Sequence, residues 1–376
     1  MSLITISIFF CFKILEKFSF KNILLLSLFL AIATQIRVIG FYLYFLLILF
    51  LFFSYYEKQF FIRKNILNLI YLIILFPLIT IFLWPFMWDN PILNFVNSLF
   101  YFSNYGWGGK LLYFGSYVDA KNLPWHYIPV WISITTPPII LISFLYSYIK
   151  TGYIFSKKFI ALDKSNKNKL WSNEDEKKDY FVFFFFSIPI FMVILLDSTL
   201  YGGWRHLYFI YTGLIYFTGV TIVALYKKKI KFLKLIIIFS LALNIFNLIK
   251  LHPYQNIYFN SFVEKNANKW FEVDYWGLGN VEAIKFILHE SGNKRTTIRT
   301  ASFTPLNYSK LMFEPSKIKN LLFTGTEQKN QDYIFTNLVF ESNPDYLEKY
   351  NIPEDYEKVF FLQRGNIILN EVYKKR

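Results

Sequence analysis

The residues from Ile66 to Trp84 read ILNLIYLIILFPLITIFLW and include no charged side chain. A helix needs about 20 predominantly apolar residues to cross the hydrocarbon core of a bilayer. Seven further apolar runs, several of them shorter, occur along the chain: Leu3–Leu15, Ile23–Ile36, Val38–Tyr55, Tyr127–Ile149, Tyr180–Leu196, Leu207–Tyr226 and Leu235–Ile249. The sequence therefore predicts a mainly α protein, a polytopic transmembrane helix bundle of about eight apolar segments.

Composition agrees with this class. The chain has 376 residues, of which 55% are hydrophobic and 17% are charged. Its net charge of +15 favours no nucleic-acid partner, because residues 251–376 hold 16 basic and 15 acidic side chains and nearly all of the excess belongs to the membrane part. The single cysteine, Cys11, excludes an intrachain disulfide.

Two domains follow from where the apolar runs stop. Residues 1–250 form the bundle, with an aromatic outer loop over 85–125, in which Ile92–Phe102 has the spacing of a helix lying in the membrane interface. Residues 251–376 predict a small α/β domain. Its expected elements are helices over Val281–His289 and Leu306–Phe313, strands over Thr296–Ala301 and Tyr333–Val339, and a hairpin over Lys358–Tyr373.

Charges in the connecting loops alternate. One set is lysine-rich and includes Lys17, Lys21, the polar 157–178 loop and the lysines from 227 to 231, whereas the other set holds Arg37, the 85–125 loop, the 197–206 loop and the C-terminal region. The positive-inside rule places the lysine-rich set in the cytoplasm. We therefore expect a multi-pass plasma (inner) membrane protein with an extracytoplasmic C-terminal domain and an N-terminus on the outer side.

The loop from Asp197 to Phe209 reads DSTLYGGWRHLYF. Gly202 and Gly203 interrupt the apolar pattern, and Arg205 and His206 begin the next span. Helix N-termini attract anions, and arginine offers a forked set of donors that fits phosphate. These two residues are candidates for binding a phosphate, and the alternative is that Arg205 only extends to the membrane interface.

Other polar and aromatic side chains gather at the same predicted edge of the membrane. Ionisable groups near membrane depth usually mark a site, and aromatic faces with carboxylates suit carbohydrate hydroxyls. The alternative is a structural role, packing the soluble domain on the membrane. The substrate-binding candidates are Trp125, His126, His252, Tyr254, Asp274 and Trp276.

Several stretches together resemble the integral-membrane glycosyltransferases of the GT-C superfamily, in particular glycosyltransferase family 39, which includes protein mannosyltransferases and aminoarabinose transferases. The similar segments are Ala33–Arg37, Trp84–Pro91, Leu123–Pro138, Tyr201–Tyr211 (YGGWRHLYFIY), His252–Asn260 and Phe271–Gly277. The resemblance implies transfer of a sugar from a polyprenyl-phosphate donor to a glycan, lipid or protein acceptor on the outer face of the membrane.

The sequence departs from that family at its beginning. Family members carry an acidic residue in a first outer loop, proposed as the catalytic base, and this chain begins after that loop. We therefore expect a truncated frame, a fragment or a shortened protein that binds the donor but transfers sugar poorly, with Asp89 as the stand-in carboxylate. No cofactor and no metal site are indicated. The competing interpretations are a non-catalytic scaffold and a transporter of cell-envelope glycan assembly.

Overall fold

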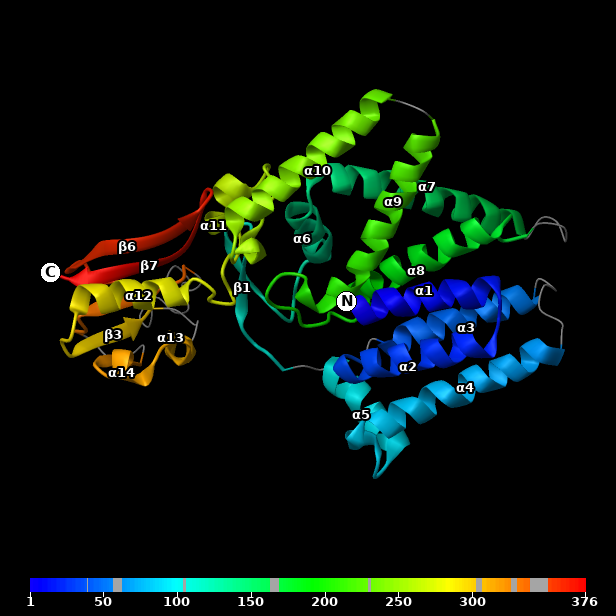
Figure 1. The fold of residues 1–376 in the computed structure, drawn as a ribbon, viewed down its shortest axis with the longest axis horizontal. Coiled ribbons are helices and arrows are strands. Elements are labelled where there is room, and N and C mark those ends of the chain that lie inside the picture. The colour runs from blue at the N-terminus through cyan, green and yellow to red at the C-terminus, as the bar shows by residue number, and fades with distance from the viewer. Residues whose placement is uncertain are drawn as a thin grey trace. The chain divides into compact units, whose positions relative to one another are not determined.

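The computed structural model describes residues 1–38, 40–56, 63–103, 106–162, 169–228, 231–301, 306–325, 330–338 and 351–376. Over these residues the chain is mainly helical, with a small sheet near its C-terminus (Figure 1). Its internal contacts form two compact units. The first unit comprises Met1–Trp107, Ile139–Thr199 and Trp204–Leu233, and the second comprises Gly108–Pro138, Leu200–Gly203 and Lys234–Arg376.

The first unit contains most of the predicted apolar runs, whereas Leu235–Ile249 and the first part of Tyr127–Ile149 belong to the second. Its elements are α1 (Ser2–Glu16), α2 (Phe20–Ile36), α3 (Gly40–Tyr56), α4 (Arg63–Leu83), the 3-10 turn η1 (Pro85–Met87), α5 (Pro91–Ser103), α7 (Pro138–Leu162), α8 (Glu174–Leu195), the 3-10 turn η2 (Arg205–Ile210) and α9 (Tyr211–Lys227). Helix α2 packs against α1, α3 and α4, and α8 packs against α1, α3 and α9. A helix is present over the predicted Ile92–Phe102 stretch, as α5, and its place in the membrane interface stays a prediction.

Four helices in the described part of the chain are long and apolar enough to cross a membrane: Asn65–Leu83, Pro138–Leu162, Glu174–Leu195 and Arg205–Lys227. Three shorter apolar helices are Phe20–Ile36, Gly40–Ser54 and Leu235–Leu251. Large apolar side chains on α4 are exposed, for example Leu78 at 57% and Phe82 at 76%. Such a surface fits a lipid environment, so the protein is a membrane protein, whereas the full count of eight spans stays a prediction.

Hydroxyl groups join three helices inside the first unit. Tyr148 of α7 and Ser187 of α8 lie 2.7 Å apart, and Ser147 of α7 lies 2.5 Å from Thr221 of α9. Because bilayer lipids offer no hydrogen bonds, hydroxyl pairs between helices are a common means of holding a membrane bundle together.

Charged side chains link the ends of α1, α7 and α8. Lys178 lies 2.5 Å from Glu16, and Lys158 lies 2.6 Å from Glu176. Lys177 is buried and donates to Glu174 and to the Leu15 carbonyl. The polar loop predicted over 157–178 is shorter in the structure, because α7 extends to Leu162 and α8 begins at Glu174, and residues 163–168 lie outside the described residues. The two lysine-rich connections, which the charge pattern predicts on the same side of the membrane, thus contact each other at one end of this unit.

The apolar run predicted over Tyr127–Ile149 is broken into two helices, which corrects the single segment expected there. Helix α6 (Tyr127–Thr135) ends at Thr136, whose backbone is extended because a residue before proline is disfavoured in the helical region. The side chain of Asn260 donates to the carbonyls of Ser133 (2.7 Å) and Thr136 (3.3 Å). These contacts satisfy carbonyls that the broken helix leaves without partners.

The second unit begins with a hairpin that the sequence did not predict. Strands β1 (Lys110–Tyr113) and β2 (Ser116–Asp119) pair antiparallel around the turn Phe114–Gly115. Phe114 has a φ of +50°, a strained conformation for a bulky residue. Its ring packs 5.2 Å from that of Phe271, centroid to centroid, and the Gly115 N–H donates to the Trp270 carbonyl. Aromatic packing therefore offsets the strain and attaches the hairpin to the segment around Phe271.

Helix α10 (Lys231–Leu251) leads into the α/β part through η3 (Gln255–Ile257), η4 (Glu264–Asn266) and α11 (Ala267–Trp270). The sheet has the order β4-β3-β5-β7-β6, where β3 pairs in parallel with β4 and β5, and the β6–β7 hairpin completes the sheet in antiparallel orientation. The strands are β3 (Thr296–Thr300), β4 (Leu321–Thr324), β5 (Tyr333–Thr336), β6 (Tyr356–Arg364) and β7 (Ile367–Lys375).

The predicted C-terminal elements are confirmed, with two differences. Helix α12 (Asn280–Ser291), strands β3 and β5 and the β6–β7 hairpin lie where they were expected, although β5 ends at Thr336, earlier than predicted, and Val339 of the predicted strand lies outside the described residues. The helix expected over Leu306–Phe313 is two short pieces, α13 (Leu306–Ser309) and η5 (Lys310–Met312), followed by α14 (Pro315–Ile318). Strand β4 was not predicted.

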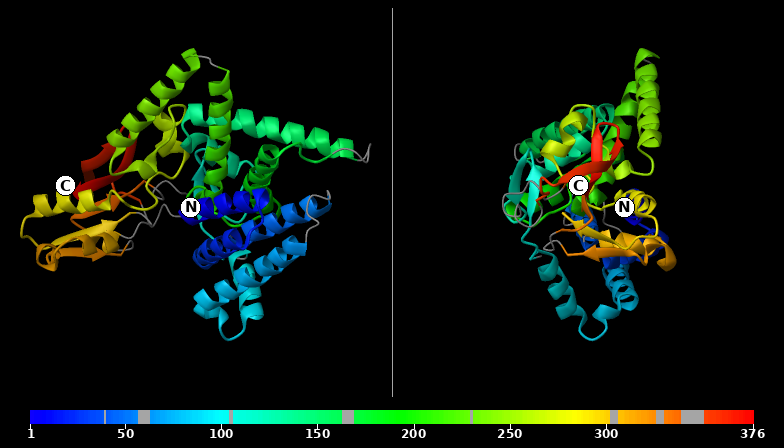
Figure 2. Two further views of the ribbon diagram at one scale, coloured as in Figure 1. Left: turned by 45° about the vertical axis from the view of Figure 1, so that its right-hand side comes forward. Right: turned by 90° about the vertical axis from the view of Figure 1, so that its left-hand side faces the viewer.

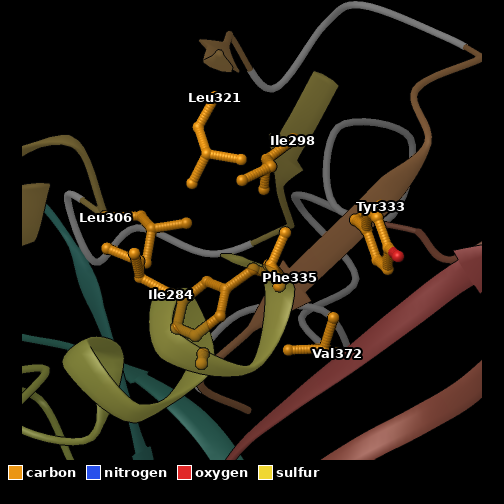
Figure 3. Packing of buried hydrophobic residues seen from close by; sticks show 9 residues of the cluster. Ile284, Ile298, Leu306, Leu321, Tyr333, Phe335 and Val372 are labelled. Carbon is orange, nitrogen blue, oxygen red and sulfur yellow. The ribbon is translucent and has the colours of Figure 1, made fainter. Parts of the chain in front are cut away.

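The core of this α/β part lies between α12 and the sheet. Side chains from α12, β3, β4, β5, β7 and α13 converge in Figure 3, among them the fully buried Ile284, Ile298 and Phe335. Burying one such side chain contributes roughly 1.5–3 kcal/mol. This cluster gives the described elements from α12 to β7 a hydrophobic core of their own.

Candidate functional site

Three basic side chains meet in the first unit, at the end where α2 stops and η2 begins. The Arg37 guanidinium donates through Nη1 to the backbone carbonyls of His206 (3.1 Å) and Arg205 (3.4 Å). Arg205 in turn donates through Nε to Nε2 of His206, at 3.5 Å. Among the described residues Arg37 makes no ion pair with a carboxylate. The two guanidinium groups thus place positive charge beside the His206 imidazole, and we call Arg37, Arg205 and His206 the basic cluster.

An apolar groove lies in the same unit. It has a volume of about 220 Å³ and lies between α2, α3, α4, η1 and α5, with Thr34, Phe41, Phe76, Ile81, Phe95 and Val96 among its lining residues. Figure 2 shows α4 and α5 meeting at the η1 turn. The hydroxyls of Thr34 and Thr80 are bonded to the carbonyls of their own helices, so the groove presents almost no polar surface.

The groove and the basic cluster are adjacent in the chain. Thr34 lines the groove three residues before Arg37, and Phe41 lines it four residues after. Helix α2 ends at Ile36, with Arg37 as its C-cap.

Asp89, the candidate stand-in for a catalytic base, lies in the turn between η1 and α5 and is exposed. No described hydrogen bond or ion pair joins it to Arg37, Arg205 or His206. The structure thus brings Arg205 and His206 together and does not bring Asp89 into contact with them.

In the second unit, Asp274 organises the loop that precedes α12. Its side chain is fully buried, and its oxygens accept hydrogen bonds from the Gly279 N–H (2.9 Å), the Leu278 N–H (3.1 Å) and the Asn256 amide (3.3 Å). Burial raises the pKa of Asp274, and the bonds from Gly279 and Leu278 oppose that rise. The carboxylate binds backbone N–H groups of the loop that leads into α12, and its zero exposure leaves no surface for a bound sugar.

The raised pKa of Asp274 predicts a pH dependence of stability. Its folded-state pKa lies above the ordinary 3.8, so the folded state holds the proton more tightly than the unfolded state does. The resulting stabilisation is fully present below the unfolded-state pKa and is lost as the pH rises through the folded-state value. We expect native-state hydrogen exchange of α12, corrected for intrinsic rates, to show this trend, and Asp274→Asn to remove it. Identical pH profiles for both proteins would contradict the assignment.

His126 and Tyr113 form a pair in the second unit. The Tyr113 hydroxyl lies 2.7 Å from Nδ1 of His126, and the two rings stack at 5.6 Å between centroids. Burial raises the pKa of Tyr113 to about 12, so its hydroxyl stays protonated at neutral pH. Trp125 packs edge-on against the same imidazole and is 68% exposed. The structure therefore brings two of the predicted substrate-binding residues, Trp125 and His126, into contact.

The remaining candidates of the second unit each contact a different neighbour. His252 is exposed and its Nδ1 lies 2.9 Å from the Gln255 amide. Tyr254 is buried beneath the Arg364 guanidinium, which lies 5.3 Å from its ring centroid. Trp276 is 56% exposed and packs on Tyr275.

Sequence reasoning did not select Arg37, although its contacts make it part of the basic cluster. The available signal was a lone arginine between two apolar runs on the less positive side of the membrane. It also missed Asn337, whose amide donates to the Asp274 carbonyl. Within the described residues no group of histidine, cysteine and acidic side chains is arranged to hold a metal ion.

Comparison with known proteins adds no relative. No family model, no curated protein and no solved structure matches this chain.

Proposed function

We propose that the protein is a multi-pass membrane glycosyltransferase that uses a polyprenyl-phosphate sugar as donor and transfers the sugar to an acceptor outside the cytoplasm. The observation that carries the proposal is the apolar groove whose lining residues Thr34 and Phe41 flank Arg37 in the chain. An isoprenoid chain is apolar and its phosphate is anionic, so the two ends of such a donor match the groove and the basic cluster.

The basic cluster suits the leaving group of this reaction. An acceptor hydroxyl attacks the sugar at C1, the bond from C1 to the phosphate oxygen breaks, and polyprenyl phosphate leaves with the electron pair. The guanidiniums of Arg37 and Arg205 stabilise the negative charge that grows on the phosphate, through charge-assisted hydrogen bonds. The hydroxyl proton needs a separate base, and we assign none.

The contacts of the first unit support the proposed orientation. Arg37 and Arg205, from two lysine-poor connections, meet at one end. Glu16 and Lys178, from two lysine-rich connections, meet in another contact. Each contact joins loops that the charge pattern places on the same side of the membrane. By the positive-inside rule, the basic cluster then lies at the outer surface, together with the C-terminal domain.

The proposal is tested by binding of farnesyl phosphate and of farnesol, its phosphate-free analogue, to the protein in nanodiscs. Farnesyl phosphate is expected to bind more tightly, because only it engages the basic cluster. Equal affinities for the two compounds would contradict a phosphate site beside the groove. Release of polyprenyl phosphate from a panel of polyprenyl-phosphate sugars, with membrane extract as acceptor, then tests transfer. Retained farnesyl phosphate binding without any release would refute the enzyme and leave a lipid-binding scaffold.

Filling the groove is expected to weaken binding of both compounds. Val96 lines the groove from α5, so Val96→Trp occupies the space that the chain needs. The matched control is Leu93→Trp on the same helix, where the side chain is 53% exposed and does not line the groove. We expect a loss of about tenfold or more, equivalent to two buried methylene groups at about 0.8 kcal/mol each. Unchanged farnesol affinity in Val96→Trp would place the chain elsewhere.

A further inference from the structure

Three large apolar side chains project from one helical turn of the α/β part. Tyr308, Leu311 and Met312 are 71%, 77% and 74% exposed. They occupy positions i, i+3 and i+4 across α13 and η5, so they lie on one face of the turn. We call these three residues the apolar tip. Contiguous apolar groups at this exposure usually mark an interaction site.

The apolar tip is held firmly by the core beneath it. Leu306, at the start of α13, is 1% exposed and belongs to the buried cluster drawn in Figure 3. Phe313, directly after η5, packs against the same cluster. With both ends of the turn anchored, the three side chains cannot be withdrawn into the core without unfolding the turn.

Lysines accompany the apolar tip. Lys310 lies between Tyr308 and Leu311 in the chain. Lys317 lies on α14, and Lys319 follows directly after that helix. The one acidic residue of this stretch, Glu314, pairs with Lys317 at 3.3 Å, and both side chains are largely exposed. The stretch over 306–320 therefore carries a net positive charge around its apolar face.

More positive charge adjoins the end of the stretch. The Asn320 side chain donates to the Asn293 carbonyl at 2.8 Å, and the Asn320 carbonyl accepts from the Thr296 N–H at 2.9 Å. These bonds bring Lys319 next to the turn that carries Lys294 and Arg295, both of which are exposed.

We propose that the apolar tip docks the C-terminal domain onto an anionic lipid bilayer. Tyr308, Leu311 and Met312 enter the boundary between headgroups and acyl chains, and Lys310, Lys317 and Lys319 contact anionic headgroups. This inference is independent of the proposed sugar transfer. It would hold for any membrane protein with this domain.

Two observations favour lipid over a protein partner. Lysine is depleted in protein–protein interfaces, whereas it surrounds this tip. Three side chains also provide far less than the roughly 800 Å² that each partner buries in a stable protein complex. A bilayer supplies the rest of the binding energy through its surface charge and through the tether that α10 provides.

The test uses the full chain in nanodiscs with an environment-sensitive fluorophore on Leu311→Cys. The native Cys11 is fully buried and is not expected to react. Lipids with a nitroxide on the acyl chain are expected to quench the label when phosphatidylglycerol is present. Phe361→Cys on β6 is the matched control, because Phe361 is also apolar and 53% exposed. It is expected to stay unquenched.

Charge and salt give a second readout. Changing Lys310, Lys317 and Lys319 to glutamine should lower the ratio of docked to undocked domain roughly fivefold for each lysine, and added salt should act in the same direction. Quenching of Leu311→Cys by acrylamide but not by nitroxide lipids would overturn the proposal. So would equal lipid quenching at position 361. A fluorescence shift that depends on protein concentration in lipid-free detergent would assign the tip to a second copy of the chain instead.

Discussion

Replacing Arg205 by alanine is expected to lower the affinity for farnesyl phosphate roughly 10- to 150-fold, since a hydrogen bond to a charged group contributes about 1.5–3 kcal/mol. Affinity for farnesol should not change, because the alcohol carries no charge for Arg205 to contact. Binding is measured in nanodiscs with the same two compounds. The difference between them isolates the phosphate from the chain.

Two further variants serve as controls for this result. Arg205→Lys should recover only part of the affinity, because an ammonium group lacks the forked geometry of the guanidinium. Lys227→Ala removes a positive charge from the last turn of α9, the helix that follows η2, and should leave both affinities unchanged. An Arg205→Ala protein that is folded and binds farnesyl phosphate as tightly as the original would show that Arg205 serves only to extend to the membrane interface.

Replacing Asp274 by alanine is expected to destabilise the α/β part by roughly 3 kcal/mol or more, since each of three buried or part-buried donors left without an acceptor costs about 1–3 kcal/mol. The Gly279 and Leu278 N–H groups and the Asn256 amide all lose their partner. Hydrogen exchange of α12 reports the loss locally. Asp355→Ala, at an exposed carboxylate of the same unit, should change stability by less than about 0.5 kcal/mol.

If Asp274 instead contacted a sugar, the opposite results would be expected. A carboxylate that binds carbohydrate would weaken sugar binding when replaced by alanine and would leave the exchange of α12 unchanged. Unaltered exchange in Asp274→Ala would therefore contradict the structural role derived from its contacts.

Helices were the most predictable part of the fold. Runs such as Ile66–Trp84 lack charge over a length that only a helix can satisfy in lipid, so composition alone decides their structure. The α/β part was also accessible where local patterns are strong, as in α12 and in the hairpin around Arg364-Gly365-Asn366. These elements depend on the period of apolar residues and on turn chemistry, and both are determined by residues that are neighbours in the chain.

Features that depend on residues distant in the chain could not be predicted from the sequence. Strand β4 has four residues and is defined by its parallel pairing with β3. The β1–β2 turn places Phe114 at a positive φ, which no local rule anticipates for phenylalanine, and its stability comes from packing on Phe271. The candidate site could be predicted only in part, for the same reason. Arg205 and His206 could be selected as a pair, but the participation of Arg37 depends on a contact across 168 positions of chain.

The ion pair between Glu16 and Lys178 also has a consequence for biogenesis. Its partners are 162 positions apart, and at synthesis rates of about 5–20 residues per second Glu16 waits roughly 8–30 s for Lys178 to emerge from the ribosome. Throughout that interval Lys17 and Lys21 act on the insertion machinery with their full charge. In the proposed topology, the early lysines thus set the orientation of the nascent chain before the contact with Lys178 forms. Until then Glu16 has, among the described residues, only Lys13 as a cationic partner, and the finished contact with Lys178 holds an orientation that was established during translation.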